Sequence, residues 1–134
     1  MHRNDELERI AKHVFQCGLQ LHRELGPGLL ESVYEAVLFE ELLQSGFRVD
    51  RQVPINIKFR GIEIANAFRA DLIVEGKLLV ELKSTENASP VHAKQVLTYL
   101  RLTGIPLGFL MNFGMDRFSD GFKRFGNGYF AEPQ

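Results

Sequence analysis

Two charged residues interrupt an otherwise apolar strand pattern between residues 78 and 84. The segment reads LLVELKS, and its charges, Glu81 and Lys83, are separated by one residue. Because side chains alternate along a strand, both charges point to the same face. A buried carboxylate or ammonium is costly unless it is paired, hydrogen-bonded or bound to a metal. The pattern therefore indicates a site that uses both groups.

A third charge lies in the preceding apolar segment, ADLIV, where Asp71 precedes Glu81 by ten residues. If only residues 76–77 formed the connecting loop, Asp71 would pair with Leu82 and face away from Glu81. A loop of odd length, or one bulge, would bring Asp71 beside Glu81 or Lys83. We expect the second register, with all three charges on one face. The alternative is a surface strand edge with a Glu-Lys ion pair, which the apolar character of both strand faces disfavours.

Two helical segments also carry polar residues at helical spacing. Glu31, Tyr34 and Glu35 stand three and four residues apart, so they share one helical face. Gln95 and Tyr99 are four residues apart and share a face in the same way. A solvated helix face would show the same spacing, so spacing alone leaves their role open.

Periodic patterns predict the elements that must position these residues. Apolar residues at steps of three and four predict two amphipathic helices, separated by the helix-breaking segment GPG. Period-two alternation then predicts strands, and a serine and a proline open a third helix before a last, uniformly apolar strand. The predicted elements are helices at residues 5–25, 29–44 and 89–104, strands at 47–59, 62–64, 68–75, 78–84 and 107–113, and an unassigned C-terminal tail.

The composition is that of an ordinary globular protein of one domain, which we expect to span residues 1–134. Of the chain, 45% is hydrophobic and 25% is charged, and no apolar run approaches the roughly 18 residues of a membrane span. The N-terminus lacks the pattern of a secretory signal, so we expect a cytoplasmic protein without a membrane partner. Cys17 is the only cysteine, which excludes an internal disulfide and makes a cysteine zinc site implausible.

The net charge of −1 requires any nucleic-acid surface to be local. Basic residues precede the Asp71 segment and recur in the C-terminal tail, where they could contact phosphates. Scattered basic residues are more often a plain solubilising surface, and their spacing gives no register with a groove.

Together these motifs resemble the PD-(D/E)xK nuclease superfamily over nearly the whole chain. Asp71 followed by Glu81-Leu82-Lys83, within strand, turn, strand, helix and strand, is similar to its D...(D/E)xK motif. The segment GLLESVY at residues 28–34 matches the signature that names the GxxExxY family, a branch of that superfamily, and QVLTY at residues 95–99 adds to the match. Ala70 stands where the motif name has proline, a departure that the superfamily tolerates.

The resemblance implies an α/β fold with a restriction-endonuclease-like core. In that fold a central mixed β-sheet is flanked by helices, here preceded by an N-terminal helical hairpin. It also implies a metal-dependent nuclease that hydrolyses phosphodiester bonds of nucleic acid, DNA rather than RNA, with Mg²⁺ or Mn²⁺ as its cation. A homodimer is compatible with this reading.

The same resemblance implies roles for individual residues. Asp71 and Glu81 would ligate the cation together with the Leu82 carbonyl, since hard cations prefer oxygen ligands. Lys83 would position the attacking water or support the charged phosphate oxygens. Glu31, on the helix before the sheet, is the candidate third carboxylate.

Further residues would complete the site on the helices that flank it. Glu35 is the alternative to Glu31 as third carboxylate, and Tyr34, Gln95 and Tyr99 are the candidates for substrate binding. Two other classes of function compete with this reading. One is a catalytically silent nucleic-acid-binding or accessory protein of the same fold, and the other is a glycosidase with paired carboxylates, which the intervening lysine disfavours.

Overall fold

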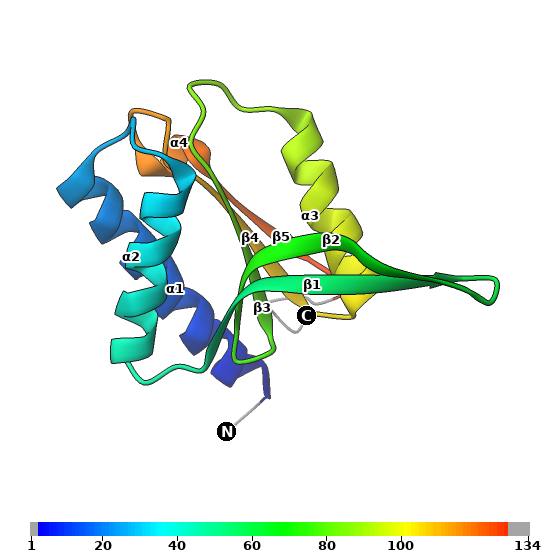
Figure 1. Cartoon of the computed structure of the whole chain (residues 1–134). Coiled ribbons are helices and arrows are strands. Elements are labelled where there is room, and N and C mark those ends of the chain that lie inside the picture. Colours follow the sequence, from blue (N-terminus) through cyan, green and yellow to red (C-terminus); the bar gives the residue numbers. More distant parts are fainter. Residues whose placement is uncertain (1–2, 129–134) are drawn as a thin grey trace.

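A five-stranded sheet separates two helical layers (Figure 1) in the computed structural model, which describes residues 3–128. α1 (Arg3–Leu25) and α2 (Glu31–Gln44) lie side by side on one face of the sheet, and α3 (Pro90–Thr103) covers the other. The remaining elements are β1 (Val49–Phe59), β2 (Ile62–Val74), β3 (Leu78–Lys83), β4 (Leu107–Asn112), the single-turn α4 (Phe118–Gly121) and β5 (Phe122–Gly126).

The strands follow one another across the sheet in the order β1-β2-β3-β4-β5. All neighbours pair antiparallel except β3 and β4, which are parallel and are connected through α3. A parallel pair needs a crossover long enough to return the chain, and α3 provides it. The expected mixed α/β fold with an N-terminal pair of helices is therefore confirmed.

Strand alternation divides the apolar residues between two cores. On β3, Val80 and Leu82 point into the larger core formed with α1 and α2, whereas Leu79 points toward α3. Glu81 and Lys83 have the parity of Leu79, so they belong to the α3 face. The α3 side of β3 is therefore apolar at its start and charged at its end.

The helix boundaries follow the signals in the sequence. α3 begins after Ser89, whose hydroxyl accepts a hydrogen bond from the Val91 N–H, and it ends at Gly104 in the left-handed conformation. α2 begins two residues later than predicted, at Glu31, and Leu30 before it is 74% exposed. No helix within residues 3–128 is long and apolar enough to cross a membrane.

Two parts of the chain differ from expectation. The strands predicted at 62–64 and 68–75 form a single 13-residue β2, because Asn66 takes a positive φ of 54° and the pairing with β1 shifts register instead of ending. The unassigned tail contains α4 and β5, and β5 pairs with β4 along one edge of the sheet. Four- and five-residue elements carry too little periodicity to be seen in the sequence.

Candidate active site

A three-residue turn sets the register of the two charged strands. Val74 pairs with Leu78, so residues 75–77 form the loop, and both Glu75 and Gly76 adopt positive φ. Leu72 then pairs with Val80, which brings the next residue of each strand, Asp71 and Glu81, opposite one another. The loop thus has the odd length that was expected to bring these two carboxylates together.

Each of the two carboxylates accepts a backbone hydrogen bond from the opposite strand, so the two side chains are interlocked. The Asp71 N–H donates to Glu81 Oε1 at 3.0 Å, and the Leu82 N–H donates to Asp71 Oδ2 at 2.8 Å. These bonds stand where ladder bonds between β2 and β3 would otherwise continue. Both carboxylates are thus fixed in place, side by side on the α3 face of the sheet.

Burial makes this pair difficult to ionise. Glu81 is 5% exposed, and burial, together with the charge of Asp71, raises the pKa of Glu81 to about 8. Burial also raises the pKa of Asp71, with a contribution from the charge of Glu35, against the hydrogen bond from the Leu82 N–H that lowers it. The pair therefore retains a proton near neutral pH, and a cation placed there would replace that proton.

Lys83 lies on the same face, half-buried beyond Glu81. Its positive charge opposes the rise in the pKa of both Asp71 and Glu81, and it forms no ion pair within the described residues. It also lowers the pKa of His92 on α3, where burial is the larger cause and Glu31 acts in the opposite direction. Lys83 therefore has an ammonium available to a water or an anion near the carboxylates.

A bridge from α2 reaches Asp71 through Gln52. The Gln52 amide donates to Glu35 Oε1 at 2.6 Å and to Asp71 Oδ1 at 3.2 Å, and Arg51 Nε donates to Glu35 Oε2 at 2.7 Å. Gln52 has a φ of 51°, rare for a residue with a side chain. Sequence reasoning missed Gln52, because no pattern predicts a left-handed residue inside a strand. It considered Arg51 only among the basic residues that could contact phosphates.

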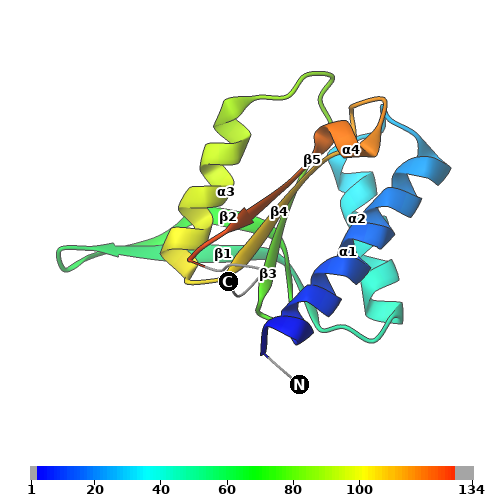
Figure 2. The same ribbon diagram turned by 180° about the vertical axis from the view of Figure 1, so that it is seen from behind.

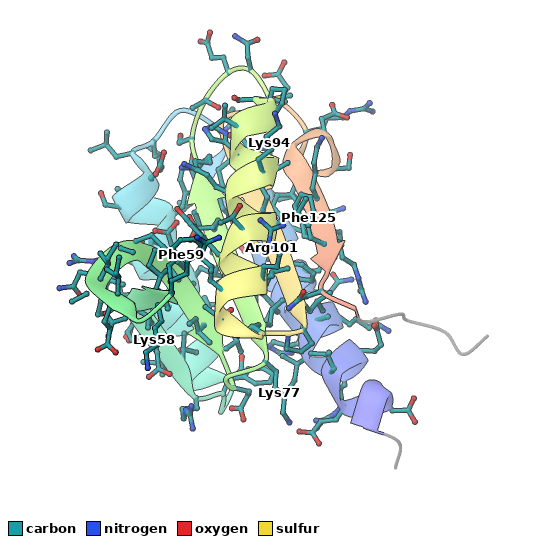
Figure 3. All side chains as sticks on the ribbon, turned by 90° about the vertical axis from the view of Figure 1, so that its right-hand side faces the viewer. Lys58, Phe59, Lys77, Lys94, Arg101 and Phe125 are labelled. Carbon is teal, nitrogen blue, oxygen red and sulfur yellow. The ribbon has the colours of Figure 1, made fainter. Side chains whose placement is uncertain are left out.

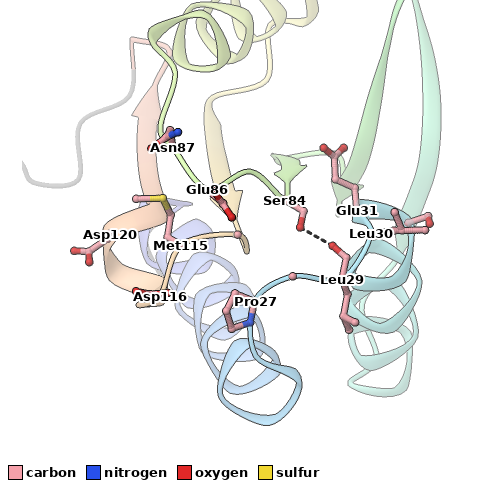
Figure 4. Close-up of a pocket in the computed structure, with 13 residues that line it drawn as sticks. Pro27, Leu29, Leu30, Glu31, Ser84, Glu86, Asn87, Met115, Asp116 and Asp120 are labelled. Atoms are coloured by element: carbon pink, nitrogen blue, oxygen red, sulfur yellow. Dashed lines mark hydrogen bonds between the residues drawn. The ribbon is translucent and has the colours of Figure 1, made fainter.

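Of the two candidate carboxylates on α2, Glu35 is the one joined to the Asp71 side chain through Gln52. Glu35 is 8% exposed, whereas Glu31, one turn earlier, is exposed. Glu31 lies at the rim of an open groove, with its carboxylate pointing away from Asp116 and Asp120 (Figure 4). Its charge acts on His92, so it flanks the Lys83 end of the site.

That groove lies beside the site and is acidic. Ser84 Oγ donates to the Leu29 carbonyl at 2.5 Å across one end of it. Its lining does not include Asp71, Glu81 or Lys83. The residues that line it are Pro27, Gly28, Leu29, Leu30, Glu31, Ser32, Ser84, Glu86, Asn87, Gly114, Met115, Asp116 and Asp120.

Tyr34 requires a correction, because the predicted contact with substrate is incompatible with its position. Its side chain is completely buried, with its ring stacked on Phe113 at 4.4 Å between centroids. The hydroxyl donates to the Gly26 carbonyl at 2.5 Å and accepts from the Leu29 N–H at 3.2 Å. Tyr34 therefore fixes the turn between α1 and α2, and its spacing from Glu31 reflects packing.

α3 brings its polar face over the carboxylate pair. Tyr99 is half-buried and stacks on Phe68 of β2 with ring centroids 3.9 Å apart. Burial, with the charges of Glu81 and Asp71, raises the pKa of Tyr99, so its hydroxyl stays protonated and able to donate. Gln95 is half-buried one turn earlier on the same helical face.

Asn112 is a further residue that sequence reasoning missed. It is 4% exposed at the end of β4, and its Oδ1 accepts from the N–H groups of Thr85 and Gly114, each at 3.0 Å. The Phe113 N–H donates to the Lys83 carbonyl at 2.8 Å. These bonds hold the end of β3, and with it the backbone that carries Lys83.

The donor set suits a hard divalent cation. Within residues 3–128, no group of three or more His, Cys, Asp or Glu side chains converges as a metal cage. Asp71 and Glu81 supply two carboxylates, and the backbone of Leu82 is already bonded to Asp71. Mg²⁺ is commonly bound by one or two carboxylates, keeping several waters and taking substrate phosphate oxygens. The residues present therefore fit Mg²⁺ or Mn²⁺ better than they fit zinc.

Comparison with known proteins places the chain in a family. A solved structure described as "Crystal structure of SSO0001" aligns with 91% of this chain and 80% of that chain, at 17% identity and a TM-score of 0.44, too low to bear on function. The search of curated proteins finds no match. A family model described as the PD-(D/E)XK nuclease superfamily matches residues 8–125, a range that includes all the charged residues of the site. The chain therefore belongs to the PD-(D/E)XK nuclease superfamily.

Proposed function

We propose that this protein is a metal-dependent nuclease that hydrolyses phosphodiester bonds of nucleic acid, DNA in preference to RNA, with Mg²⁺ or Mn²⁺ as its cation. The observation that carries the proposal is the interlocked pair, Asp71 and Glu81, on a face it shares with Lys83. Superfamily membership supports the same class of reaction. We further propose that residues 1–134 act as one domain and that the chain belongs to the GxxExxY branch.

The carboxylate pair is the proposed cation site. Asp71 and Glu81 would bind the cation, with the Leu82 carbonyl as a further ligand. When bound, the cation supplies positive charge that stabilises the phosphoryl transition state and makes a nearby water more acidic. A buried carboxylate beside a half-buried one, both of raised pKa, is costly to ionise unless a positive charge accompanies the pair.

Three side chains act on the substrate in this proposal. Lys83 donates a hydrogen bond to the attacking water or to a phosphate oxygen, since its ammonium is near the pair but not engaged in an ion pair there. The Tyr99 hydroxyl is protonated and donates to the substrate. Gln95, on the same face of α3, contacts the phosphate backbone or a site carboxylate.

The third carboxylate comes from α2. Glu35 is favoured by its bridge to Asp71 through Gln52, which places it in one hydrogen-bonded network with the pair. Glu31 remains the alternative, because it flanks Lys83 and is free to turn toward a cation that also carries a phosphate.

Cleavage and binding assays test the proposal. Single-strand, duplex and branched DNA and matched RNA are incubated with the protein in EDTA, Ca²⁺, Mg²⁺ or Mn²⁺, alongside Asp71→Asn and Glu81→Gln. We expect cleavage in Mg²⁺ or Mn²⁺ that both variants abolish, and binding that is poor in EDTA and improves with Ca²⁺, because clustered carboxylates repel phosphate until a cation neutralises them. Asp50→Asn, at an exposed position on β1, is the matched control.

One result would favour the competing class of function. If no substrate is cut in Mg²⁺ or Mn²⁺ while one is bound equally well in EDTA, the protein is a catalytically silent nucleic-acid-binding or accessory protein of this fold.

A further inference from the structure

The hairpin of β1 and β2 extends well beyond the rest of the sheet (Figures 1 and 2). We refer to residues 54–69, from the Pro54–Arg69 pair to the turn at Arg60 and Gly61, as the β1–β2 arm. A strand rises about 3.3 Å per residue, so the part beyond Ile55 reaches on the order of 15 Å outward. None of the other strand pairs in residues 3–128 projects in this way.

One face of the β1–β2 arm is apolar along its length. The cross-strand pairs on this face are Ile55 with Phe68, Ile57 with Ile64, and Phe59 with Ile62. At the tip this surface is uncovered, since Phe59 and Ile62 are each 61% exposed and Ile64 is 47% exposed. Exposed apolar residues that form a contiguous patch commonly mark a surface that contacts another molecule.

The apolar face continues into the site described above. At the base of the arm, Phe68 stacks on Tyr99 of α3, the helix that covers the face of the sheet on which Asp71 and Glu81 lie (Figure 1). The arm therefore projects from the same side of the sheet that carries the carboxylate pair. A long molecule bound across that pair would pass along the arm.

The charge of the arm suits a polyanion. The β1–β2 arm holds three cationic residues, Lys58, Arg60 and Arg69, and one carboxylate, Glu63, a net of +2 in a chain whose total is −1. Glu63 is the cross-strand partner of Lys58, on the face of the arm opposite Phe59 and Ile62. α3 adds Lys94 and Arg101 without any carboxylate, and Figure 3 shows both on the side from which the arm projects. The Arg60 guanidinium lies 5.0 Å from the centroid of the Phe59 ring. A positive charge and an aromatic ring therefore lie next to each other at the tip of the arm.

We propose that the β1–β2 arm binds duplex DNA, with Lys58 and Arg60 on phosphates and Phe59 and Ile62 against the bases. A two-stranded ribbon fits the major groove, and apolar side chains of architectural proteins contact or wedge base steps. The inference rests on the proposed function for its ligand. A second copy of the chain is a poorer occupant, because three side chains at a hairpin tip expose far less than the roughly 800 Å² per partner that a stable dimer buries.

Binding of a fluorescent duplex, measured by anisotropy in Ca²⁺ at several salt concentrations, tests the inference. The proteins are the wild type, the tip variant Phe59→Ala/Ile62→Ala, and the charge variant Lys58→Ser/Arg60→Ser. The control, Lys12→Ser/Arg23→Ser, removes the same charge from exposed positions of α1, across the sheet from α3. Thermal unfolding confirms that each variant is folded.

We expect both arm variants to bind roughly tenfold more weakly and the control to bind within about twofold of wild type. The charge variant should also reduce the slope of log affinity against log salt by about 2, because two phosphates would no longer be neutralised by a cationic side chain. The tip variant should leave that slope unchanged, because it removes no charge.

Failure of the arm and failure of the nuclease proposal give different results. If both arm variants bind duplex as tightly as wild type, the proposal that the arm binds DNA is wrong and the nuclease proposal is unaffected. The arm proposal is also wrong if the wild type binds no duplex. Arm-dependent binding without cleavage in Mg²⁺ supports the arm and contradicts the nuclease proposal. If sedimentation shows a wild-type dimer that the tip variant converts to monomer, with duplex affinity unchanged, the arm is an interface between copies and the inference is wrong.

Discussion

At the scale of single residues, Asp71 and Glu81 are fixed side by side, which destabilises the folded protein when both carboxylates are ionised. Each accepts a backbone N–H from the opposite strand, so neither can move away without breaking a hydrogen bond. The repulsion between the two charges therefore lowers the stability of the folded protein, and binding of a proton or a cation reduces it.

This arrangement predicts how stability depends on pH. A carboxyl whose folded pKa is raised binds its proton more tightly when folded, so its contribution is fully present below the unfolded pKa, about 4.5, and is lost as pH rises through the folded value of about 8. In EDTA, we expect the free energy of unfolding, measured in urea, to fall by a few kcal/mol over that window. Mg²⁺ should reduce the fall.

Glu81→Gln provides the matched comparison for the pH prediction. A glutamine can still accept the Asp71 N–H through its amide oxygen, but it does not ionise. The variant should lose much of the pH dependence and be more stable than wild type at pH 8 to 9. If the free energy of unfolding depends on pH in the same way in this variant and in wild type, ionisation of Glu81 does not cause the loss of stability.

Lys83 is predicted to act on the reaction more than on binding. Lys83→Ala removes the ammonium near the attacking water and the developing phosphate charge, so kcat should fall roughly 100-fold or more while the duplex Kd changes little. Single-turnover cleavage and anisotropy on the same duplex measure the two effects. Lys12→Ala on α1 is the control, and equal losses in kcat and affinity after Lys83→Ala would mean that Lys83 only binds phosphate.

At the scale of elements, Gln52 connects α2 to the carboxylate pair through an unusual strand conformation. Gln52→Gly removes the bridge to Asp71 and Glu35 and also relieves the positive φ. We expect Mn²⁺ affinity, measured by electron paramagnetic resonance, to fall roughly tenfold even where stability is retained or increased. Gln44→Ala, at the exposed end of α2, should leave Mn²⁺ affinity unchanged. Unaltered affinity after Gln52→Gly would show that the bridge has no part in the site.

The loop after β4 is predicted to be intolerant of a single methyl group. A Cβ added at Gly114 would collide with the backbone of Thr85, whereas one added at Gly18 would meet the ends of the Phe118 and Met111 side chains, at 2.8 and 2.9 Å. Side-chain ends can move more easily than backbone, so Gly114→Ala should destabilise by roughly 1 to 3 kcal/mol and Gly18→Ala by less. Urea unfolding of both variants measures the difference, and the reverse order would contradict it.

The elements that sequence reasoning predicted well are those with long periodic patterns. α1 and α3 have apolar stripes and clear end signals, β3 is an apolar run apart from Glu81 and Lys83, and β4 is apolar up to Asn112. The pair of charges on β3 was visible because it interrupts such a run. The register of Asp71 was expected only because a shared site would compensate the charges. Strand alternation alone does not give it, since it depends on the length of a loop whose residue Glu75 adopts a left-handed conformation.

The features missed depend on contacts between distant segments. Gln52 and Asn112 gain their roles from partners on other elements, and a polar residue at the end of a strand has no pattern that announces this. Tyr34 was misread because helical spacing gives the face of a residue but not what covers it. In the structure, Phe113, directly after β4, stacks on the ring, which is completely buried.

At the scale of the whole molecule, charge differs between two regions of the surface. The β1–β2 arm and α3 together carry five basic residues and one carboxylate, whereas the groove beyond β3 is lined by Glu31, Glu86, Asp116 and Asp120. A polyanion bound at the carboxylate pair should therefore extend toward the arm, where it is attracted, and away from the groove, where it is repelled. The net charge of −1 hides this division.

The carboxylate pair, and not the acidic groove, is the proposed site of the cation. Crystals soaked in Mn²⁺ and measured at a wavelength where manganese scatters anomalously test this directly. We expect an anomalous peak roughly 2.0 to 2.6 Å from carboxylate oxygens of both Asp71 and Glu81. A peak only in the groove, among Glu86, Asp116 and Asp120, or a pair left without manganese at concentrations that fill other sites, would contradict it.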